Sequence, residues 1–417
     1  MAQHDYVIDN STGANVRADI NNALLAISSN NSGSSAPSTN YASQFFANTS
    51  TSIMQLRNTA NNAHVNVFTL AGGPSFAVDG TINSLNIGKG ANSVAGNTCF
   101  GESALDASVS GEDNTAIGKN ALTTLTSGTK NSALGSGALQ LNTTGTQNVA
   151  VGSLTLDANT TGGNNTACGE GSLSANTTAS NNTAVGFQAL EENTTGTENV
   201  AVGAIALTAA TTASYNTGIG RYALGNTTTG GSNTGVGHNV LKENTTGTQN
   251  VAVGGSTLDA NTTGGANTAI GENALGANTT ANNNVAVGRV ALGANSTGTQ
   301  NVAVGTNSLD ANTTANNNTG LGYNSLTENT TGTSNVAVGA HTLAANTTAG
   351  NNTAVGKSSL NANTTGEHNT GVGQSSLVLL TTGDQNTAVG SFSLQGATTG
   401  EYNVAMGYNA LGANTTA

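Results

Sequence analysis

The sequence predicts an all-β protein whose main part is a parallel β-solenoid of about nineteen 17-residue coils, preceded by a small region of helix and β-meander. Three observations support this fold class. A glycine recurs every 17 residues from Gly101 to Gly407, without insertion or deletion. A leucine follows each of these glycines by four residues, and small and β-branched residues precede it. Units of this length need stacked neighbours to bury their apolar side chains, so we expect a rod.

Residues 1–37 form the first predicted segment. Val16, Ile20, Leu24 and Ile27 recur at the spacing of one helical face, which predicts a short helix. The apolar stripe either packs against its own domain or docks onto another protein or another copy of the chain. The sequence leaves both alternatives open, and these four residues are therefore candidates for an attachment helix.

Residues 38–70 are expected to form a small β-meander. Three strand-like runs, Tyr41–Phe46, Ser52–Arg57 and His64–Leu70, are separated by turn-forming residues. Residues 71–96 are rich in glycine, serine and asparagine, with spaced apolar residues. We expect this stretch to be the transition that caps and starts the rod.

Residues 97–417 hold the repeats. We number each unit from its asparagine, so that the recurring glycine is at place five. Asparagine at place one and leucine at place nine are present in all nineteen units. A helix is disfavoured because each glycine costs about 1 kcal/mol relative to alanine. Instead, places two to four should form a strand, the glycine should turn the chain, and a second short strand should carry places eight and nine. Stacking then predicts a leucine core and a ladder of asparagine amides from coil to coil.

The third place of the unit holds only alanine, glycine or cysteine. We expect it to lie on the strand face opposite the core, where small side chains let another backbone approach closely. Ala150, Ala184, Ala201, Ala252 and Ala303 represent this candidate chain–chain seam. Because the strip is the same along the whole rod, another copy of the chain is the simplest partner. This predicts a homo-oligomer, with three chains as the hypothesis.

The two cysteines, Cys99 and Cys168, are about four coils apart. At ~4.8 Å per stacked strand this separation is roughly 19 Å, whereas a disulfide needs Cα atoms within about 7 Å. We therefore expect no intrachain disulfide. Both cysteines occupy places that are small or aliphatic in other units, which predicts that they lie in the core.

The sequence shows no arrangement of residues that would carry catalysis or hold a cofactor. Its five histidines have no ligand spacing and tryptophan is absent, so we expect no enzymatic activity, no cofactor and no metal site. Nine Lys and Arg residues against 21 Asp and Glu, a net charge of -12, give no basic footprint for nucleic acid. No apolar run approaches the ~18 residues of a membrane helix and no secretion signal is visible, so no membrane insertion is expected.

The repeat itself resembles a known one. The stretch from Asn182 to Leu190, Asn-Thr-Ala-Val-Gly-x-x-Ala-Leu, resembles the Asn-Ser-Val-Ala-Ile-Gly repeat of trimeric autotransporter adhesin heads. The resemblance covers about 320 residues, although the 17-residue unit is longer than the adhesin period. It implies a left-handed parallel β-roll, with three chains packed together.

A second resemblance lies in the first roughly 70 residues. The runs His4–Ile8, Arg17–Leu24 and Asn30–Gly33, followed by Leu56–Val65, resemble the virion-attachment end of cyanophage and related marine phage tail fibres. This resemblance implies a tail fibre of the virion, assembled in the host cytoplasm and docked by its N-terminus to tail adaptor or nozzle proteins. A host surface receptor would then be bound by a distal tip outside this sequence.

The sequence thus predicts a homotrimeric phage tail fibre that projects a rigid shaft for host-cell adsorption. The alternative is a trimeric bacterial surface adhesin, which should carry a secretion signal and a C-terminal membrane anchor, and neither is visible. A third class is a self-assembling scaffold fibre. The last unit stops at its fifteenth place, Ala417. We therefore expect either that the biological chain continues or that another protein caps this end.

Overall fold

The computed structural model describes residues 17, 18, 20, 21, 24, 34, 45–51, 53–57, 64–69, 80–82 and 85–415. Of the candidate attachment helix, Ile20 and Leu24 are helical, with side chains 42% and 58% exposed. Val16 and Ile27 lie outside the described residues. Within the described residues, no helix has the length and apolar character needed to cross a membrane.

The predicted β-meander is confirmed as a three-stranded antiparallel sheet, in the order β1 (Phe45–Asn48), β2 (Ile53–Arg57) and β3 (His64–Thr69). The described part of the first strand begins at Phe45, and residues 41–44 of the expected run lie outside the described residues. The register between β2 and β3 shifts at Met54 and Gln55, which marks a bulge.

A short antiparallel hairpin precedes the first coil. Strand β4 (Gly80–Ile82) pairs with β5 (Leu85–Gly88), and β5 pairs antiparallel with the first strand of the solenoid, β6 (Thr98–Gly101). The single-turn helix η1 (Ala91–Ser93) follows, and Val94 packs against the core. Strand β5 therefore covers the edge of β6, which would otherwise expose unpaired backbone groups.

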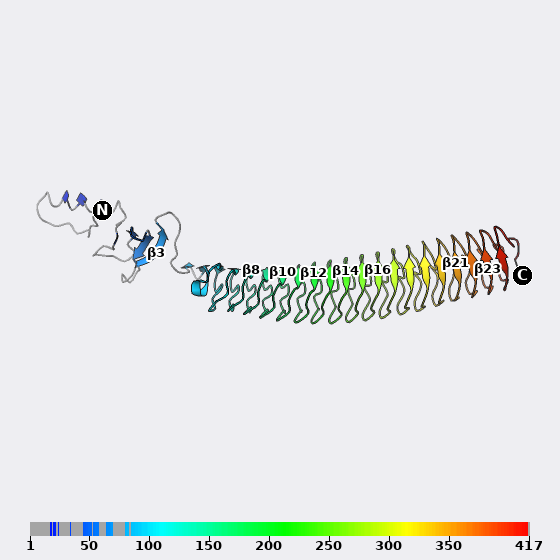
Figure 1. The fold of residues 1–417 in the computed structure, drawn as a ribbon, viewed down its shortest axis with the longest axis horizontal. Helices are drawn as coiled ribbons and strands as arrows, with labels where there is room; N and C mark the ends of the chain where they lie inside the picture. The colour runs from blue at the N-terminus through cyan, green and yellow to red at the C-terminus, as the bar shows by residue number, and fades with distance from the viewer. Residues whose placement is uncertain are drawn as a thin grey trace.

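The rest of the chain is a parallel β-solenoid with one coil per 17-residue unit (Figure 1). In the described residues 85–415, each coil contributes one strand and each strand pairs with the next without any shift of register. After β6 the strands are β7 (Thr115–Ile117), β8 (Ser132–Leu134), β9 (Val149–Val151), β10 (Thr166–Cys168), β11 (Thr183–Val185), β12 (Val200–Val202), β13 (Thr217–Ile219), β14 (Thr234–Val236), β15 (Val251–Val253), β16 (Thr268–Ile270), β17 (Val285–Val287), β18 (Val302–Val304), β19 (Thr319–Leu321), β20 (Val336–Val338), β21 (Thr353–Val355), β22 (Thr370–Val372), β23 (Thr387–Val389) and β24 (Val404–Met406).

The prediction of a second strand in each coil is wrong. Places seven and nine adopt left-handed backbone conformations, as at Leu154 (φ 51°) and Leu156 (φ 52°), which a strand excludes. The chain instead makes a tight double turn around each core leucine. The turns still bond from coil to coil, since the amide of Leu156 donates to the carbonyl of Ser172 at 3.1 Å. Stacking therefore satisfies backbone groups that a single coil would leave unpaired.

The leucine core is confirmed. The leucine at place nine is fully buried in every coil from Leu105 to Leu394, and only Leu411 of the last coil is half exposed. Each buried leucine contributes on the order of 1.5–3 kcal/mol of gross stabilisation. The small residues at places three and eight pack around this column in one continuous cluster.

The asparagine ladder is confirmed too, and the structure adds a second one. At place one, Asn165 donates from its backbone N at 3.0 Å and from Nδ2 at 3.1 Å to Oδ1 of Asn148, one coil earlier. At place twelve, Asn159 Nδ2 donates to Asn142 Oδ1 at 2.8 Å. The sequence pattern places these asparagines in a turn, yet their side chains are fully buried.

The expected chain–chain seam is wrong. The side chains of the five alanines proposed for it are 0% exposed within a single chain: Ala150, Ala184, Ala201, Ala252 and Ala303. The third place points into the coil, and its residues are small because the core leucines leave room there for little more than a methyl group. A Cβ atom built on Gly218, which holds this place, would lie 3.4 Å from Cδ1 of Leu207. No second chain can reach this row.

Candidate interaction surfaces of the shaft

Because the register never shifts, outward side chains at one place of the unit form a straight row along the rod. These rows define three surfaces of the shaft. The strand face carries places two and four, the hydroxyl face carries places fourteen and sixteen, and the turn face carries places six, seven, ten and eleven. Each surface is as long as the stack of coils (Figure 1).

The strand face is the apolar surface of the shaft. Its burial pattern is the reverse of the one predicted, since β10 has place three buried and places two and four exposed. Several large apolar side chains on it are 36–48% exposed: Phe100, Ile117, Leu134, Val149, Val185, Ile219, Val251, Val253, Ile270, Val302, Leu321 and Val355. Monomeric proteins rarely expose a contiguous apolar patch larger than a few hundred Å². This face therefore has the character of an interface.

The two cysteines lie on opposite sides of the strand layer. Cys99, at place three, is 2% exposed and lies in the core as expected. Cys168, at place four, is exposed on the strand face, so its predicted core position is wrong. Neither cysteine takes part in a disulfide within the part of the chain that the structure describes.

The hydroxyl face is polar and uncharged along most of its length. Place fourteen holds an exposed serine or threonine in each coil from Ser110 to Thr399. The neighbouring threonines at place thirteen are half-buried and bond within the shaft, as when Thr143 Oγ1 donates to the carbonyl of Thr160 at 3.0 Å. This face presents hydroxyl groups at fixed intervals and carries no large apolar side chains.

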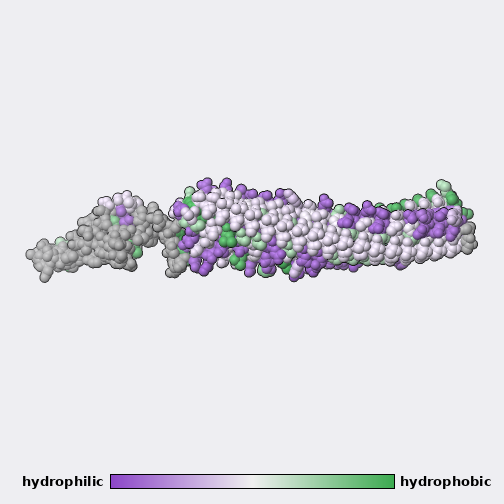
Figure 2. All heavy atoms as spheres, turned by 90° about the horizontal axis from the view of Figure 1, so that it is seen from below, coloured by the Kyte–Doolittle hydropathy of each residue, from purple (hydrophilic) through white to green (hydrophobic). Residues whose placement is uncertain are grey.

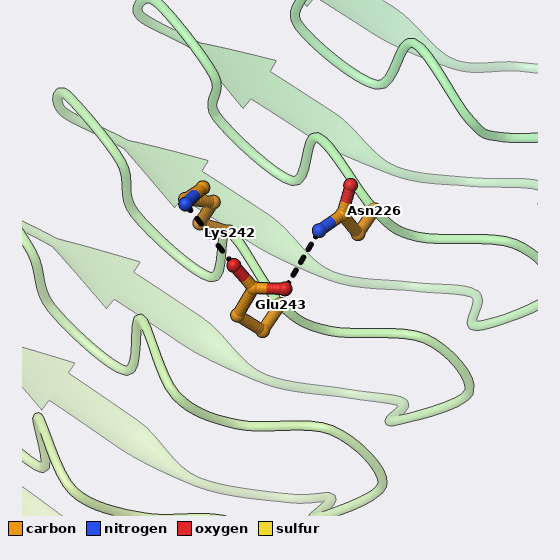
Figure 3. A network of polar contacts seen from close by, with 3 residues as sticks. All are labelled: Asn226, Lys242 and Glu243. Atoms are coloured by element: carbon orange, nitrogen blue, oxygen red, sulfur yellow. Dashed lines mark hydrogen bonds and ion pairs between the residues drawn. The ribbon is translucent and has the colours of Figure 1, made fainter.

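The turn face carries most of the charged and aromatic side chains. In one cluster, Lys242 Nζ lies 3.1 Å from Glu243 Oε1, and Asn226 Nδ2 donates to Glu243 Oε2 at 2.7 Å (Figure 3). These contacts, with the Lys242 hydrogen bond the larger, lower the pKa of Glu243 below its usual value. Arg221 and Lys242 also lie 5.1 and 5.7 Å from the ring centroid of Tyr222.

Charge is scattered over this surface rather than gathered. Figure 2 shows one face of the shaft as largely pale, with separate hydrophilic patches. Among the described residues, no group of three or more His, Cys, Asp or Glu side chains is placed to hold a metal ion. The features that distinguish the shaft are therefore the rows of outward side chains that repeat from coil to coil, above all those of the strand face.

The sequence matches no known family model and no curated protein. The chain is therefore classified by its fold, which is a parallel β-solenoid built from tandem 17-residue repeats.

Proposed function

We propose that this protein is a structural phage tail fibre that attaches to the virion by its N-terminal segment and projects the solenoid as a rigid shaft for host-cell adsorption. The observation that supports this proposal is the unbroken register of the nineteen stacked coils. At ~4.8 Å per strand, the stack gives a shaft of roughly 90 Å. A spacer of this kind acts by length and stiffness.

Stiffness follows from the way the coils are joined. Each junction carries backbone bonds from the strand and the turns, together with the asparagine ladder at place one. Bending the shaft would stretch several of these bonds at once. The low number of charged groups leaves little Coulomb energy for salt to screen, which suits a fibre exposed to changing ionic strength.

In this role the fibre is a homotrimer whose chains meet through the strand face. The face is about 90 Å long and about 10 Å wide, three residues at ~3.3 Å each, which gives roughly 900 Å² per chain. A stable interface buries about 800 Å² per partner. A second copy of the chain is the partner whose side-chain rows repeat at the same interval along the whole length.

The N-terminal segment would dock onto tail adaptor or nozzle proteins, and the host receptor would be met at a distal tip. Gold-labelled antibody against the coils should mark tail-attached fibres on virions of the parent phage in negative-stain microscopy. Residues 1–70 alone should retain purified tails in a pull-down, and the shaft alone should not. Labelling of bacterial cell surfaces instead, with no retention of tails, would favour the trimeric surface adhesin.

A further inference from the structure

The asparagine ladder at place twelve is interrupted inside the shaft. Its first block runs from Asn142 to Asn193 through Nδ2–Oδ1 bonds of 2.8, 2.8 and 3.0 Å. Its second block runs from Asn244 to Asn363 through bonds of 2.8–3.3 Å. The two coils between these blocks carry Ala210 and Thr227 at place twelve. The shaft therefore consists of two laddered blocks joined by a stretch in which this ladder is missing.

The interruption leaves a buried acceptor unpaired. Asn193 Oδ1 has no hydrogen-bond partner, and the side chain is fully buried. In an intact coil this oxygen accepts a bond from the next asparagine, as Asn176 Oδ1 accepts from Asn193 Nδ2 at 3.0 Å. The next coil here carries Ala210, whose methyl group cannot donate. Because solvent has no access to the oxygen in the closed shaft, water does not replace the missing donor.

A carbonyl in the same turn also loses a donor. In the intact coil, the carbonyl of Ala179 accepts from Asn176 Nδ2 at 3.1 Å, in addition to a 2.9 Å bond from the asparagine at place one. The equivalent carbonyl of Ala213 keeps the place-one bond, from Asn199 Nδ2 at 2.8 Å. Ala210 supplies no second donor to it. The turn that carries Ala210 is therefore held by fewer bonds than the same turn in a laddered coil.

The far side of the interruption is weakly joined as well. Asn244 Nδ2 lies 3.5 Å from Thr227 Oγ1, which is longer than every ladder bond in either block. A contact of this length is at the limit of a hydrogen bond. Three successive junctions, from the coil of Asn193 to the coil of Asn244, therefore lack a full ladder bond at place twelve.

A second interruption differs in what fills it. Asn363 Oδ1 is also buried and unpaired, and the next coil carries Leu380 at place twelve. Leu380 is fully buried in the core cluster, so its apolar side chain offsets part of the lost bonding. Ala210 is buried too, but it adds only a methyl group. The interruption at Ala210 is therefore the weaker of the two, and it lies between two intact blocks.

From this geometry we propose that residues 199–232, the coils of Ala210 and Thr227, form a weak joint at which the shaft opens before either block does. Opening here lets water reach Asn193 Oδ1 and the carbonyl of Ala213, so it recovers free energy that opening of a laddered coil does not. The inference does not depend on the proposed role in a tail fibre, because it concerns the coils of one chain.

The joint loosens without separating the two blocks. The ladder at place one crosses it unbroken, since the backbone amide of Asn199 donates to Asn182 Oδ1 and that of Asn216 donates to Asn199 Oδ1, each at 3.0 Å. The strands on both sides of the joint also pair in register. Opening therefore affects the turns around place twelve and leaves the strand layer continuous.

Hydrogen–deuterium exchange of the full chain, read by mass spectrometry, tests this proposal. The amides of Thr211 and Thr228 donate across junctions of the joint at 3.1 and 3.0 Å. Those of Thr330 and Thr347 do the same in the second block at 2.9 and 3.1 Å, so the bond lengths are matched. Peptides that cover the joint should exchange at least about tenfold faster than the matched peptides of the second block.

Two variants assign the difference to the ladder. Ala210→Asn supplies the missing donor and should slow exchange in the joint at least about fivefold. Asparagine holds this place in every coil of both blocks, which guards against misfolding. Asn312→Ala is the reverse change inside the second block. It leaves Asn295 Oδ1 without its 2.8 Å donor, and it should create a new fast-exchanging turn there while the joint stays unaltered.

Circular dichroism and light scattering of each variant confirm that the fold and the assembly are retained, so a change in exchange can be assigned to local opening. The proposal is overturned if the joint exchanges no faster than the second block. It is equally overturned if Ala210→Asn leaves exchange in the joint unchanged, or if Asn312→Ala fails to raise exchange in its own turn.

Discussion

The backbone amide of Asn250 donates a 3.0 Å hydrogen bond to Oδ1 of Asn233, the residue at the same place one coil earlier. Both side chains are fully buried. Asn250 Nδ2 reaches the same oxygen at 3.1 Å, and Asn233 Nδ2 donates to the carbonyl of Gly247 at 2.8 Å. One asparagine thus links its own coil to the next and closes its own turn. Neither a shorter nor an apolar side chain can make all of these bonds.

Replacing Asn233 by alanine should therefore destabilise the shaft by about 3 kcal/mol, because buried donors and a buried carbonyl lose their partner. The midpoint of urea unfolding, followed by circular dichroism, measures the effect. Gln249→Ala, at an exposed place of the same coil, is the control and should shift stability by less than about 0.5 kcal/mol. Equal effects of the two changes would show that the asparagine ladder makes no particular contribution to the stability of the shaft.

The neighbouring glycines Gly254 and Gly255 should respond to alanine in opposite ways. Gly254 has φ 135°, and a Cβ atom there would lie 2.8 Å from the carbonyl carbon of Gly271 in the next coil. A Cβ atom on Gly255 would meet nothing within 4 Å, and the φ of this residue is not left-handed. We expect Gly254→Ala to destabilise the chain by about 2 kcal/mol or more, and Gly255→Ala to be neutral or slightly stabilising. Thermal unfolding of the pair decides this, and a tolerated Gly254→Ala would contradict the stacking geometry.

A leucine at Ala184 should damage the fold itself rather than separate chains. The alanine is 0% exposed beside the core leucines, so overpacking should cost about 3 kcal/mol or more. Thr183→Val is the matched control, because Val200 holds the same place in the next coil. Limited proteolysis should cut Ala184→Leu rapidly and spare the control. A well-folded Ala184→Leu that merely dissociates would restore the third place as a chain–chain seam.

The repeat period, the leucine core and the first ladder follow from the sequence because each depends only on which residues recur in register. Which face of the strand points into the core does not follow in this way. Alternation shows that places two and four share a face, but alanine and valine are both compatible with either side. The apolarity of the larger residues, such as Val200, favours a core position for them. They lie outside because the leucine already fills the narrow interior.

Two other features escape prediction for separate reasons. The left-handed conformation of Leu156 (φ 52°) is disfavoured for a branched side chain, so the residue type does not predict it. The ladder at place twelve does leave a signal. Where asparagine is missing, the place is held by small or apolar residues such as Leu125, Ala210 and Leu380, a substitution pattern typical of burial.

Stability should depend on pH through Asp157. Burial is the main cause that raises its pKa above the usual 3.8, opposed by hydrogen bonds from its own backbone amide and that of Ala158. The folded chain therefore binds this proton more tightly than the unfolded chain, and its stability falls as pH rises from about 3.8 through the raised value. Asp157→Asn should be more stable than the unaltered chain at pH 7, with the difference vanishing in more acidic solution.

Glu243 provides a control of opposite sign for this pH dependence. Its pKa is lowered, first by the hydrogen bond with Lys242 and then by that from Asn226. Its contribution is therefore present at neutral pH and is lost as pH falls through the lowered value. Glu243→Gln should be slightly less stable at pH 7, by little because the pair is solvent-exposed. Urea midpoints at a series of pH values measure both variants, and a destabilised Asp157→Asn at pH 7 would contradict the assignment.

The strand face provides the test of assembly. Ile219 and Ile270, at place four, are 40% and 41% exposed, and aspartate at both positions should separate the chains because burial of two unpaired carboxylates is costly. Since these side chains point away from the core, each separated chain should keep its circular dichroism spectrum. Thr229→Asp with Thr280→Asp places the same charges on the hydroxyl face of the same two coils, and this variant should keep the mass of the unaltered assembly. Sedimentation equilibrium gives the mass of each. A trimer that survives the change on the strand face, or one that separates only when the hydroxyl face is charged, would move the interface to another row.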